Sequence, residues 1–283
     1  MKLSIITINW NDAEGLRMTV GSVLGQTARD EVEYIVVDGA STDGSADVLK
    51  EFDGQIDRWV SEADKGIYNA MNKGVRMATG DYLLFLNSGD ILFDTGVVAG
   101  ILPELHDEDI ITGKMLYRGK GRFSQAEAPL TLLYFYQGSL PHDATFIRRQ
   151  LLIDTPYDES LRIVSDWKFF VEAIVLKGCS YRIVDNVISD FDTHGISATN
   201  RDLCQKEREK ALKELFPPRV LEDYLRFVKG GGYQDTDYDR FYIKLRDYQY
   251  GRVLYNLNVR IMHLVARFNK RAAWAKDFQT KKK

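Results

Sequence analysis

The chain has 283 residues, 45% of them hydrophobic and 28% charged, with a formal net charge of −3. This composition is typical of a globular protein, and the length allows one large α/β domain with a smaller appendage. The negative charge argues against a general nucleic-acid-binding protein, which needs a positive surface to displace counterions from phosphates. The two cysteines, Cys179 and Cys204, are too few for a disulfide framework and lack the spacing of metal ligands.

The start of the chain carries a short apolar run at residues 3–8. This run is shorter than the hydrophobic region of a signal peptide, so it is better explained as a buried strand. No uninterrupted apolar stretch approaches the roughly 20 residues of a membrane span. The sequence therefore predicts a cytoplasmic protein that is either soluble or bound peripherally to the inner face of the cell membrane.

Strand and helix patterns alternate along the first half of the chain. The predicted strands are residues 3–8, 33–37 and 82–86, and the predicted helices lie around residues 16–24, 48–52 and 67–77. Such alternation predicts an α/β fold, Rossmann-like, with a mixed but mostly parallel sheet flanked by helices. Ligands of such sheets bind beyond the carboxyl ends of the strands, so polar residues at those ends are the first candidates for chemistry.

The second half of the chain is less regular. Strands and loops mix between residues 110 and 188, and a helix is predicted at residues 166–176. After Thr199 the pattern becomes helical, with a break at Pro217 and Pro218 and a loop at the glycines 230–232. We therefore predict a domain at residues 1–205 and a helical C-terminal region at residues 206–283.

Polar clusters follow the predicted strands at residues 9–12, 38–44 and 87–90. In the second cluster, Asp38 could accept a hydrogen bond from a nucleobase or a ribose, and Gly39 permits close approach of the backbone. A turn in which Asp43 and Ser45 cap the following helix explains part of this cluster equally well. In the third cluster, Asp90 could bind a hard divalent cation, although an aspartate in a turn is the commoner role for an isolated acid.

These segments resemble the GT2 glycosyltransferases of bacterial polysaccharide synthesis, which have the GT-A fold. The most specific segment is residues 61–74, which read SEADKGIYNAMNKG. Similar segments stand in the family's order at residues 4–11, 22–27, 36–44 and 78–90, and further matches follow at residues 141–146 and 157–167. Several ordered matches make chance a poor explanation.

The resemblance implies a nucleotide site and a metal site. The positions that it assigns to the nucleotide are Ile8, Asn9, Trp10, Asp38, Asp64 and Lys65. The family's DxD-type motif binds a divalent ion, Mn²⁺ or Mg²⁺, but here Asn87 and Gly89 replace its aspartates and leave Asp90 as the strong ligand. His194 is a further candidate to bind the metal or the phosphates. Asn87 is a candidate to contact the acceptor or the donor, and His142 is a candidate to contact the acceptor.

Asp166 occupies the position of the family's catalytic aspartate. A general base of this kind accepts the proton of the acceptor hydroxyl while that oxygen attacks the anomeric carbon. Asp166 could equally be an acid in the first turn of the helix that follows, stabilised by the helix dipole, and the two roles are compatible.

The predicted function is inverting transfer of a sugar from a nucleotide-sugar, by resemblance a UDP-sugar, to a hydroxyl of a glycan or lipid-linked acceptor. An inactive nucleotide-sugar-binding scaffold is the alternative, which the altered DxD-type motif favours and the acid at Asp166 disfavours. A nucleotidyltransferase would need a basic, glycine-rich phosphate loop after the first strand, and residues 9–12 supply none.

The last segment is basic and amphipathic. Residues 252–283 contain nine Lys or Arg and one acid, Asp277, and apolar residues from Leu254 to Ala272 recur on one helical face. Such a helix could bind an anionic membrane surface, dock on its own domain, or contact a second subunit of a homo-oligomer.

Overall fold

The computed structural model describes residues 2–193 and 200–228. The chain divides into two compact units, Met1–Leu215 and Phe216–Lys283. In the second unit the described helix is α10 (Pro218–Val228), which begins at one of the prolines of the predicted break. His194, the glycine loop and the basic segment 252–283 lie outside the described residues. The domain boundary that we predict at residue 205 falls inside helix α9 (Arg201–Leu215) and stays a prediction.

The described residues of the first unit form a nine-stranded sheet with the order β3-β2-β1-β4-β8-β6-β9-β5, in which β7 pairs with β6. Its strands are β1 (Leu3–Asn9), β2 (Val32–Asp38), β3 (Arg58–Ser61), β4 (Tyr82–Phe85), β5 (Ile91–Leu92), β6 (Ile110–Tyr117), β7 (Arg122–Ser124), β8 (Thr145–Arg148) and β9 (Tyr181–Phe191). Strands β1 to β4 run parallel, and β8 pairs antiparallel with β4. The strand and helix alternation predicted for the first half is confirmed.

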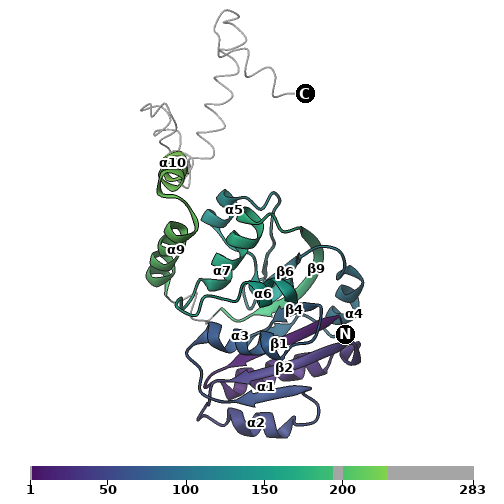
Figure 1. Ribbon diagram of the computed structural model, residues 1–283. Coiled ribbons are helices and arrows are strands. Elements are labelled where there is room, and N and C mark those ends of the chain that lie inside the picture. The colour runs from purple at the N-terminus through teal and green to yellow at the C-terminus, as the bar shows by residue number, and fades with distance from the viewer. Residues whose placement is uncertain (1, 194–199, 229–283) are drawn as a thin grey trace, which may run out of the picture. The chain divides into compact units, whose positions relative to one another are not determined.

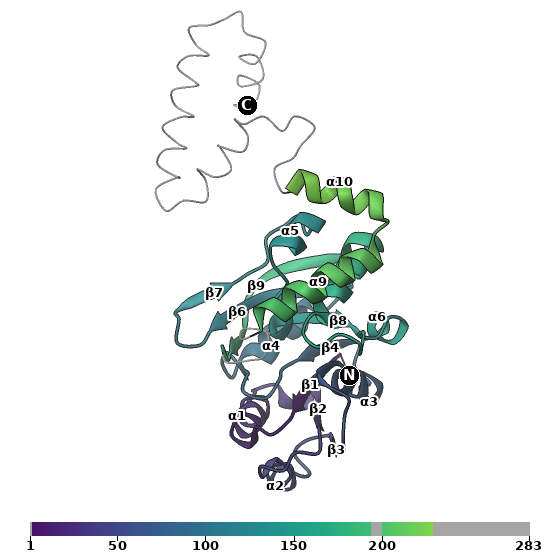
Figure 2. The same ribbon diagram turned by 90° about the vertical axis from the view of Figure 1, so that its left-hand side faces the viewer.

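Helices cover both faces of the sheet. The α-helices of the first unit are α1 (Ala13–Leu24), α2 (Ser45–Glu51), α3 (Ile67–Met77), α4 (Val97–Ile101), α5 (Leu132–Gln137), α6 (Arg149–Asp154), α7 (Ser165–Phe170) and α9, together with the π-helix η4 (Val171–Leu176) and the 3-10 turns η1 (Arg29–Glu31), η2 (Leu102–Glu104) and η3 (His142–Ala144). Figures 1 and 2 show α1 and α3 on opposite sides of β1 and β2.

The alternation of side chains along a strand explains this two-sided packing. Ile5 of β1 belongs to the core that also contains Leu16 and Val20 of α1. Its neighbour Ile6 points the other way, against Gly74 of α3, where a Cβ atom would lie 2.5 Å from Ile6 Cγ2. The close packing of α3 on the sheet therefore depends on glycine at this position.

The carboxyl ends of the parallel strands meet in register. Asn9, the last residue of β1, pairs with Asp38, the last of β2, and Asp38 pairs with Ser61, the last of β3. Three polar residues that are distant in sequence therefore lie side by side at the carboxyl ends of β1, β2 and β3. The carboxyl ends of the strands are where an α/β protein places its ligand.

Candidate functional site

Asp38 lies at the centre of a buried hydrogen-bond network at this edge. It is 0% exposed, and its carboxylate accepts bonds from Asn9 Nδ2 (2.7 Å), Ser61 Oγ (2.6 Å), and the Oγ (2.5 Å) and N–H (3.0 Å) of Ser41. Burial acts to raise the pKa of Asp38, but the bonds from Ser41, Ser61 and Asn9 outweigh it and lower that pKa below its usual value. Asp38 therefore holds the loop after β2 as an anion.

The direct contact with a base or ribose that we expected of Asp38 stays a prediction. Its carboxylate is engaged by protein donors on both oxygens. Asn9 is occupied in the same network, because its Oδ1 accepts a bond from Ser88 Oγ at 2.7 Å. Ile8 is buried in β1 and presents its carbonyl oxygen to the N–H of Ser88 at 3.1 Å. Ile8, Asn9 and Asp38 therefore form the buried base of the site at the carboxyl ends of β1 and β2.

The side chains of Trp10 and Asp64 form the surface next to Asn9 and Asp38, and Gly39, which both of them border, is buried. The Trp10 side chain is 70% exposed. A Cβ atom on Gly39 would lie 2.5 Å from Asp64 Oδ2 and 3.2 Å from Trp10 Cδ1, so both side chains border the bare backbone of this glycine. An exposed indole ring beside a carboxylate oxygen is suited to a planar ring that carries an N–H donor.

Asp64 and Lys65 lie in the turn that leads into α3. Asp64 Oδ1 accepts a bond from the N–H of Gly66 at 2.9 Å, which fixes the carboxylate in this turn. The backbone N–H of Lys65 donates to Asn69 Oδ1 at 3.1 Å, and its side chain is exposed. The Lys65 ammonium group lies near enough to Glu159 for its charge to help lower the pKa of that acid, after the hydrogen bonds from Asn72 and Asn69.

Asp43 and Ser45 have the structural role that we considered for them. Asp43 Oδ1 accepts bonds from the N–H and the Oγ of Ser45 at 3.1 and 2.6 Å. Asp43 Oδ2 accepts the N–H of Ala13, at the start of α1, at 2.7 Å. This residue thus ties the start of α2 to the start of α1.

The turn after β4 buries one of its acids. Asp90 is 3% exposed, and its Oδ1 accepts the N–H of Asp192 at 2.8 Å. Burial, and then the neighbouring charge of Asp143, raises the pKa of Asp90 well above its usual range. Burial also raises the pKa of Asp143, to about 6, against a hydrogen bond from Ser189. The charge of Asp143 therefore destabilises the ionised form of Asp90, and the charge of Asp190 acts in the same way on Asp143.

The oxygen atoms of this turn suit a divalent cation that phosphates would complete. Asn87 Oδ1 is buried without a hydrogen-bond partner among the described residues, and a cation would satisfy it as well as the charge on Asp90. Within residues 2–193 and 200–228, no three His, Cys, Asp or Glu side chains are grouped so as to hold a metal by themselves. Mg²⁺ commonly takes one or two protein carboxylates and fills its shell with phosphate and water, so Asn87 and Asp90 fit that pattern.

Asp166 stands in the first turn of α7, as the sequence pattern suggested, and it is partly exposed. Its Oδ1 lies 2.7 Å from the hydroxyl of Tyr68 on α3, and the same hydroxyl lies 2.6 Å from the carbonyl oxygen of Ile163. Burial and the negative charge of Asp166 raise the pKa of Tyr68 well above its usual range, so this tyrosine stays a hydrogen-bond donor. Among the described residues, Oδ2 of Asp166 has no hydrogen-bond partner.

His142 belongs to an aromatic cluster near Asp166. Its ring stacks on Phe85 of β4 with centroids 5.0 Å apart, and its Nε2 lies 2.8 Å from the hydroxyl of Tyr157. Burial lowers the pKa of His142, although the nearby Asp166 acts in the opposite direction. The imidazole is therefore neutral at pH 7 and supports the wall of the site. Its contact with an acceptor stays a prediction.

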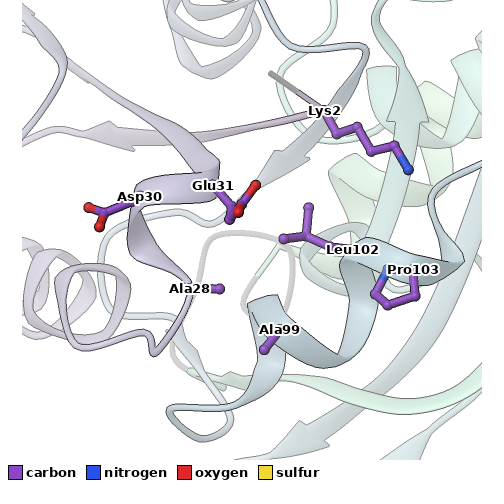
Figure 3. A pocket seen from close by; sticks show the side chains of 7 residues that line it. All are labelled: Lys2, Ala28, Asp30, Glu31, Ala99, Leu102 and Pro103. Atoms are coloured by element: carbon purple, nitrogen blue, oxygen red, sulfur yellow. The ribbon is translucent and has the colours of Figure 1, made fainter.

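A surface hollow of about 690 Å³ lies at the opposite end of the strands, lined by Lys2, Ala28, Asp30, Glu31, Ala99, Leu102 and Pro103. Figure 3 shows that its charged side chains do not converge on a common point. Because ligands of α/β sheets bind at the carboxyl ends of the strands, we do not assign this hollow to the nucleotide.

The residues that our sequence analysis missed are Ser41, Ser61, Tyr68 and Asp143, which supply the partners of the assigned acids. Tyr68 and Ser61 stand within the most specific segment, residues 61–74, so their position in that motif was the available signal. Asp143 stands within the matched segment 141–146, and that position was its signal.

Comparison with known proteins agrees with the site's place in the fold. Residues 4–158 match the family model described as Glycosyl transferase family 2. A glycosyltransferase of Mycobacterium tuberculosis is 33% identical over 204 residues, which cover 69% of this chain and 77% of that protein. A PGL/p-HBAD biosynthesis glycosyltransferase of Mycobacterium bovis is 31% identical over 199 residues, with 68% and 77% covered.

Solved structures share the fold at lower identity. TarS of S. aureus in complex with UDP-GlcNAc has a TM-score of 0.61 at 18% identity, with 90% of this chain and 78% of that chain covered. The TarS complex with UDP has a TM-score of 0.57 at 23% identity, with 68% of this chain and 60% of that chain covered. A mannosyltransferase of Pyrobaculum calidifontis in complex with GDP-Man and Mn²⁺ has a TM-score of 0.52 at 18% identity, with 67% and 56% covered.

Among residues 2–193 and 200–228, no helix has the length and apolar character of a membrane span. The family match covers more than half of the chain and includes each strand end that forms the site described above. This chain therefore belongs to glycosyl transferase family 2, and it is a glycosyltransferase with the GT-A fold.

Proposed function

We propose that the chain transfers a sugar from a UDP-sugar to a hydroxyl of a glycan or lipid-linked acceptor, with inversion at the anomeric carbon and with Asp166 as the general base. The observation that carries this proposal is the carboxylate of Asp166, held at Oδ1 by Tyr68 and partly exposed. A fixed carboxylate with one oxygen available is what proton abstraction from an acceptor hydroxyl requires.

The nucleotide would lie across the surface formed by the side chains of Trp10 and Asp64, next to the buried backbone of Gly39. The base would stack on the exposed ring of Trp10, and the carboxylate of Asp64 would accept an N–H of the base. Lys65 would reach the diphosphate from the same turn. The preference for UDP is supported by the TarS structures, which hold UDP and UDP-GlcNAc, and the mannosyltransferase with GDP-Man marks the alternative nucleotide.

Asn87 and Asp90 would hold a divalent cation, Mn²⁺ or Mg²⁺, and we keep His194 as a further candidate ligand. The Mn²⁺ bound by the mannosyltransferase is the comparison that supports it. When bound, such a cation would neutralise negative charge on the leaving diphosphate. This chain's own contribution is the carboxyl group of Asp90, which is 3% exposed, and the buried Oδ1 of Asn87, which has no hydrogen-bond partner among the described residues.

The proposed reaction is a single in-line displacement. The acceptor oxygen forms a bond to the anomeric carbon from the face opposite the diphosphate, while its proton passes to Oδ2 of Asp166. The bond from the anomeric carbon to the diphosphate oxygen breaks in the same step, and the nucleoside diphosphate leaves with that electron pair. We assign the proton to Oδ2 because the hydroxyl of Tyr68 lies against Oδ1 at 2.7 Å.

The substitution Asp166→Asn tests this assignment, because the amide keeps the size of the side chain and cannot accept the proton. We expect turnover to fall by roughly 10² or more, the usual scale for a missing general base, while the affinity for UDP stays unchanged. Glu159→Gln is the matched control, since Glu159 is the neighbouring acid but is bonded to Asn69 and Asn72 at 2.8 and 2.9 Å. Near-normal turnover in a folded Asp166→Asn protein would remove Asp166 from the mechanism.

The membrane contact stays a prediction from the sequence. The nine cations of residues 252–283 are the feature that supports binding to an anionic surface at the inner face of the cell membrane. Flotation with anionic vesicles, with and without that segment, tests it. Equal recovery of the two proteins would favour docking on this chain or on a second subunit instead.

A further inference from the structure

Helix α9 binds the backbone of the segment that leads to Asp166. Its residue Glu207 is 8% exposed, and Oε1 accepts the N–H of Arg162 at 2.8 Å while Oε2 accepts the N–H of Ile163 at 2.9 Å. A buried carboxylate is costly unless donors satisfy it. Here two consecutive backbone amides do so, and they lie just before α7.

The same helix also binds residues that follow Asp166. The guanidinium of Arg208 lies over the ring of Trp167, 4.9 Å from its centroid. Glu214 Oε2 accepts a bond from Lys168 Nζ at 2.7 Å, and Lys168 reaches Asp158 at the same distance. Figure 1 shows α9 beside α7. Contacts from one helix thus hold the chain on both sides of Asp166.

Tyr68 holds the same segment from α3. Its hydroxyl lies 2.6 Å from the carbonyl oxygen of Ile163, whose N–H is bound by Glu207. The one proton of this hydroxyl is shared between the Ile163 carbonyl and Oδ1 of Asp166, so Tyr68 links these two groups from α3 while α9 binds the N–H of Ile163. A displacement of Ile163 would move the start of α7 and change the position of the Asp166 carboxylate.

We infer that Glu207 is a positioning residue for the transfer reaction, which acts by fixing Arg162 and Ile163 and so the orientation of Asp166. This inference rests on the proposed role of Asp166 as the base. It gives the reaction a residue of α9. Glu207 lies beyond the end of the domain at residues 1–205 that the sequence predicts. Glu207 makes no contact with the strand ends that form the nucleotide surface, so its effect belongs to the reaction and not to donor binding.

The substitution Glu207→Gln tests the inference on the full chain. Glutamine keeps one acceptor oxygen, but its NH₂ group faces the second backbone N–H, so one bond is lost and replaced by a contact between two donors. Since misplacing a catalytic group by about 1 Å can cost roughly 10²-fold, we expect kcat to fall by about 10-fold to 10²-fold. The KM for the UDP-sugar that the wild-type protein turns over fastest, and the affinity for UDP, should change less than about twofold, since the hydrogen bonds of Glu207 go to Arg162 and Ile163 and not to Trp10 or Asp64.

Two further measurements separate positioning from general stability. Hydrogen exchange of the peptide covering residues 158–168 should quicken in Glu207→Gln, while exchange in β1 stays unchanged. Glu209→Gln is the control, because Glu209 is exposed on the same helix and accepts a bond from Gln205 at 2.9 Å. This control should match the wild type in turnover and in exchange.

A double variant shows whether Glu207 acts through Asp166. If it does, Glu207→Gln should lower turnover little further in a protein that already carries Asp166→Asn. Unchanged exchange at residues 158–168, a fully additive loss, or a loss that appears only in KM would each overturn the inference. Normal turnover in Glu207→Gln beside an impaired Asp166→Asn would overturn it and leave the proposed function intact, whereas normal turnover in Asp166→Asn would overturn both.

Discussion

Replacing Asp38 with asparagine distinguishes direct contact with the nucleotide from support of the loop after β2. The carboxylate of Asp38 is buried and accepts four hydrogen bonds, from Asn9, Ser61 and twice from Ser41. Hydrogen bonds to a charged group contribute about 1.5–3 kcal/mol each. The carbonyl oxygen of the asparagine side chain can still accept hydrogen bonds. Its NH₂ group, however, replaces an acceptor oxygen and faces groups that are themselves donors. We therefore expect the free energy of unfolding to fall by about 2–4 kcal/mol.

The loss of loop order should weaken UDP binding by about tenfold or more, because Gly39 and its neighbours border the nucleotide surface that we propose. Urea unfolding at pH 7 measures the first effect and calorimetry with UDP measures the second. Ser61→Ala is the control, since it removes one donor at the edge strand, and it should cost about 1 kcal/mol. An unchanged free energy of unfolding together with abolished UDP binding would refute our reasoning. That result would support direct contact between Asp38 and the nucleotide.

The pH dependence of the Asp38 variant follows from linkage. The pKa of Asp38 is lowered in the folded protein, so its ionised form contributes stability above the ordinary value of 3.8. That contribution is lost as the pH falls below this value and through the lower pKa of the folded state. The difference between the wild type and Asp38→Asn should therefore shrink in acid.

Three further predictions concern other parts of the site. Gly39→Ala places a Cβ atom against Asp64; it should cost UDP binding about 1 kcal/mol, roughly fivefold in affinity by calorimetry, and unchanged affinity would place the base elsewhere. The pKa of Asp158 is lowered to about 2, because bonds from Lys168 and Ser160 outweigh burial. Asp158→Asn should therefore cost up to about 2 kcal/mol of stability at pH 7. A stability difference between wild type and variant that did not close between pH 4 and pH 2 in acid unfolding would contradict this cause. Asp90→Ala should abolish the rise in melting temperature that Mn²⁺ adds in the presence of UDP, and a full metal effect in the variant would exclude Asp90 as a ligand.

The local elements of the parallel half could be predicted from sequence because their patterns are strong. The apolar run at residues 3–8 is β1, and helix α3 has the bounds Ile67–Met77 that the helical spacing gave. Strand β3 was missed because it lies at the sheet edge, where Arg58 and Ser61 are exposed and leave no apolar run to recognise. The later strands pair across long separations, and no local pattern specifies that β6 lies between β8 and β9.

The candidate site could be located from sequence but its internal connections could not. An acid after a buried strand pointed to Asp38, yet whether it faces a ligand or a loop depends on Ser61, which lies 23 positions further along the chain. Likewise, the sequence indicated Asp90 as a ligand, but its pKa is raised first by burial and then by the charge of Asp143, which lies 53 positions further along the chain. Burial and charge at a residue are properties of its neighbours in space.

The connection between Asp166, Tyr68 and Glu207 extends the same point to the limits of the domain. Tyr68 and Asp166 are separated by 98 positions, and Glu207 is separated from Ile163 by 44. In sequence, Glu207 stands among the charged residues of α9, where an acid is expected to face solvent. Its two backbone amide donors become visible only when the loop before α7 folds over the helix. A boundary drawn from composition therefore separates α9 from the site, whereas the hydrogen bonds of Glu207 make that helix part of the support for Asp166.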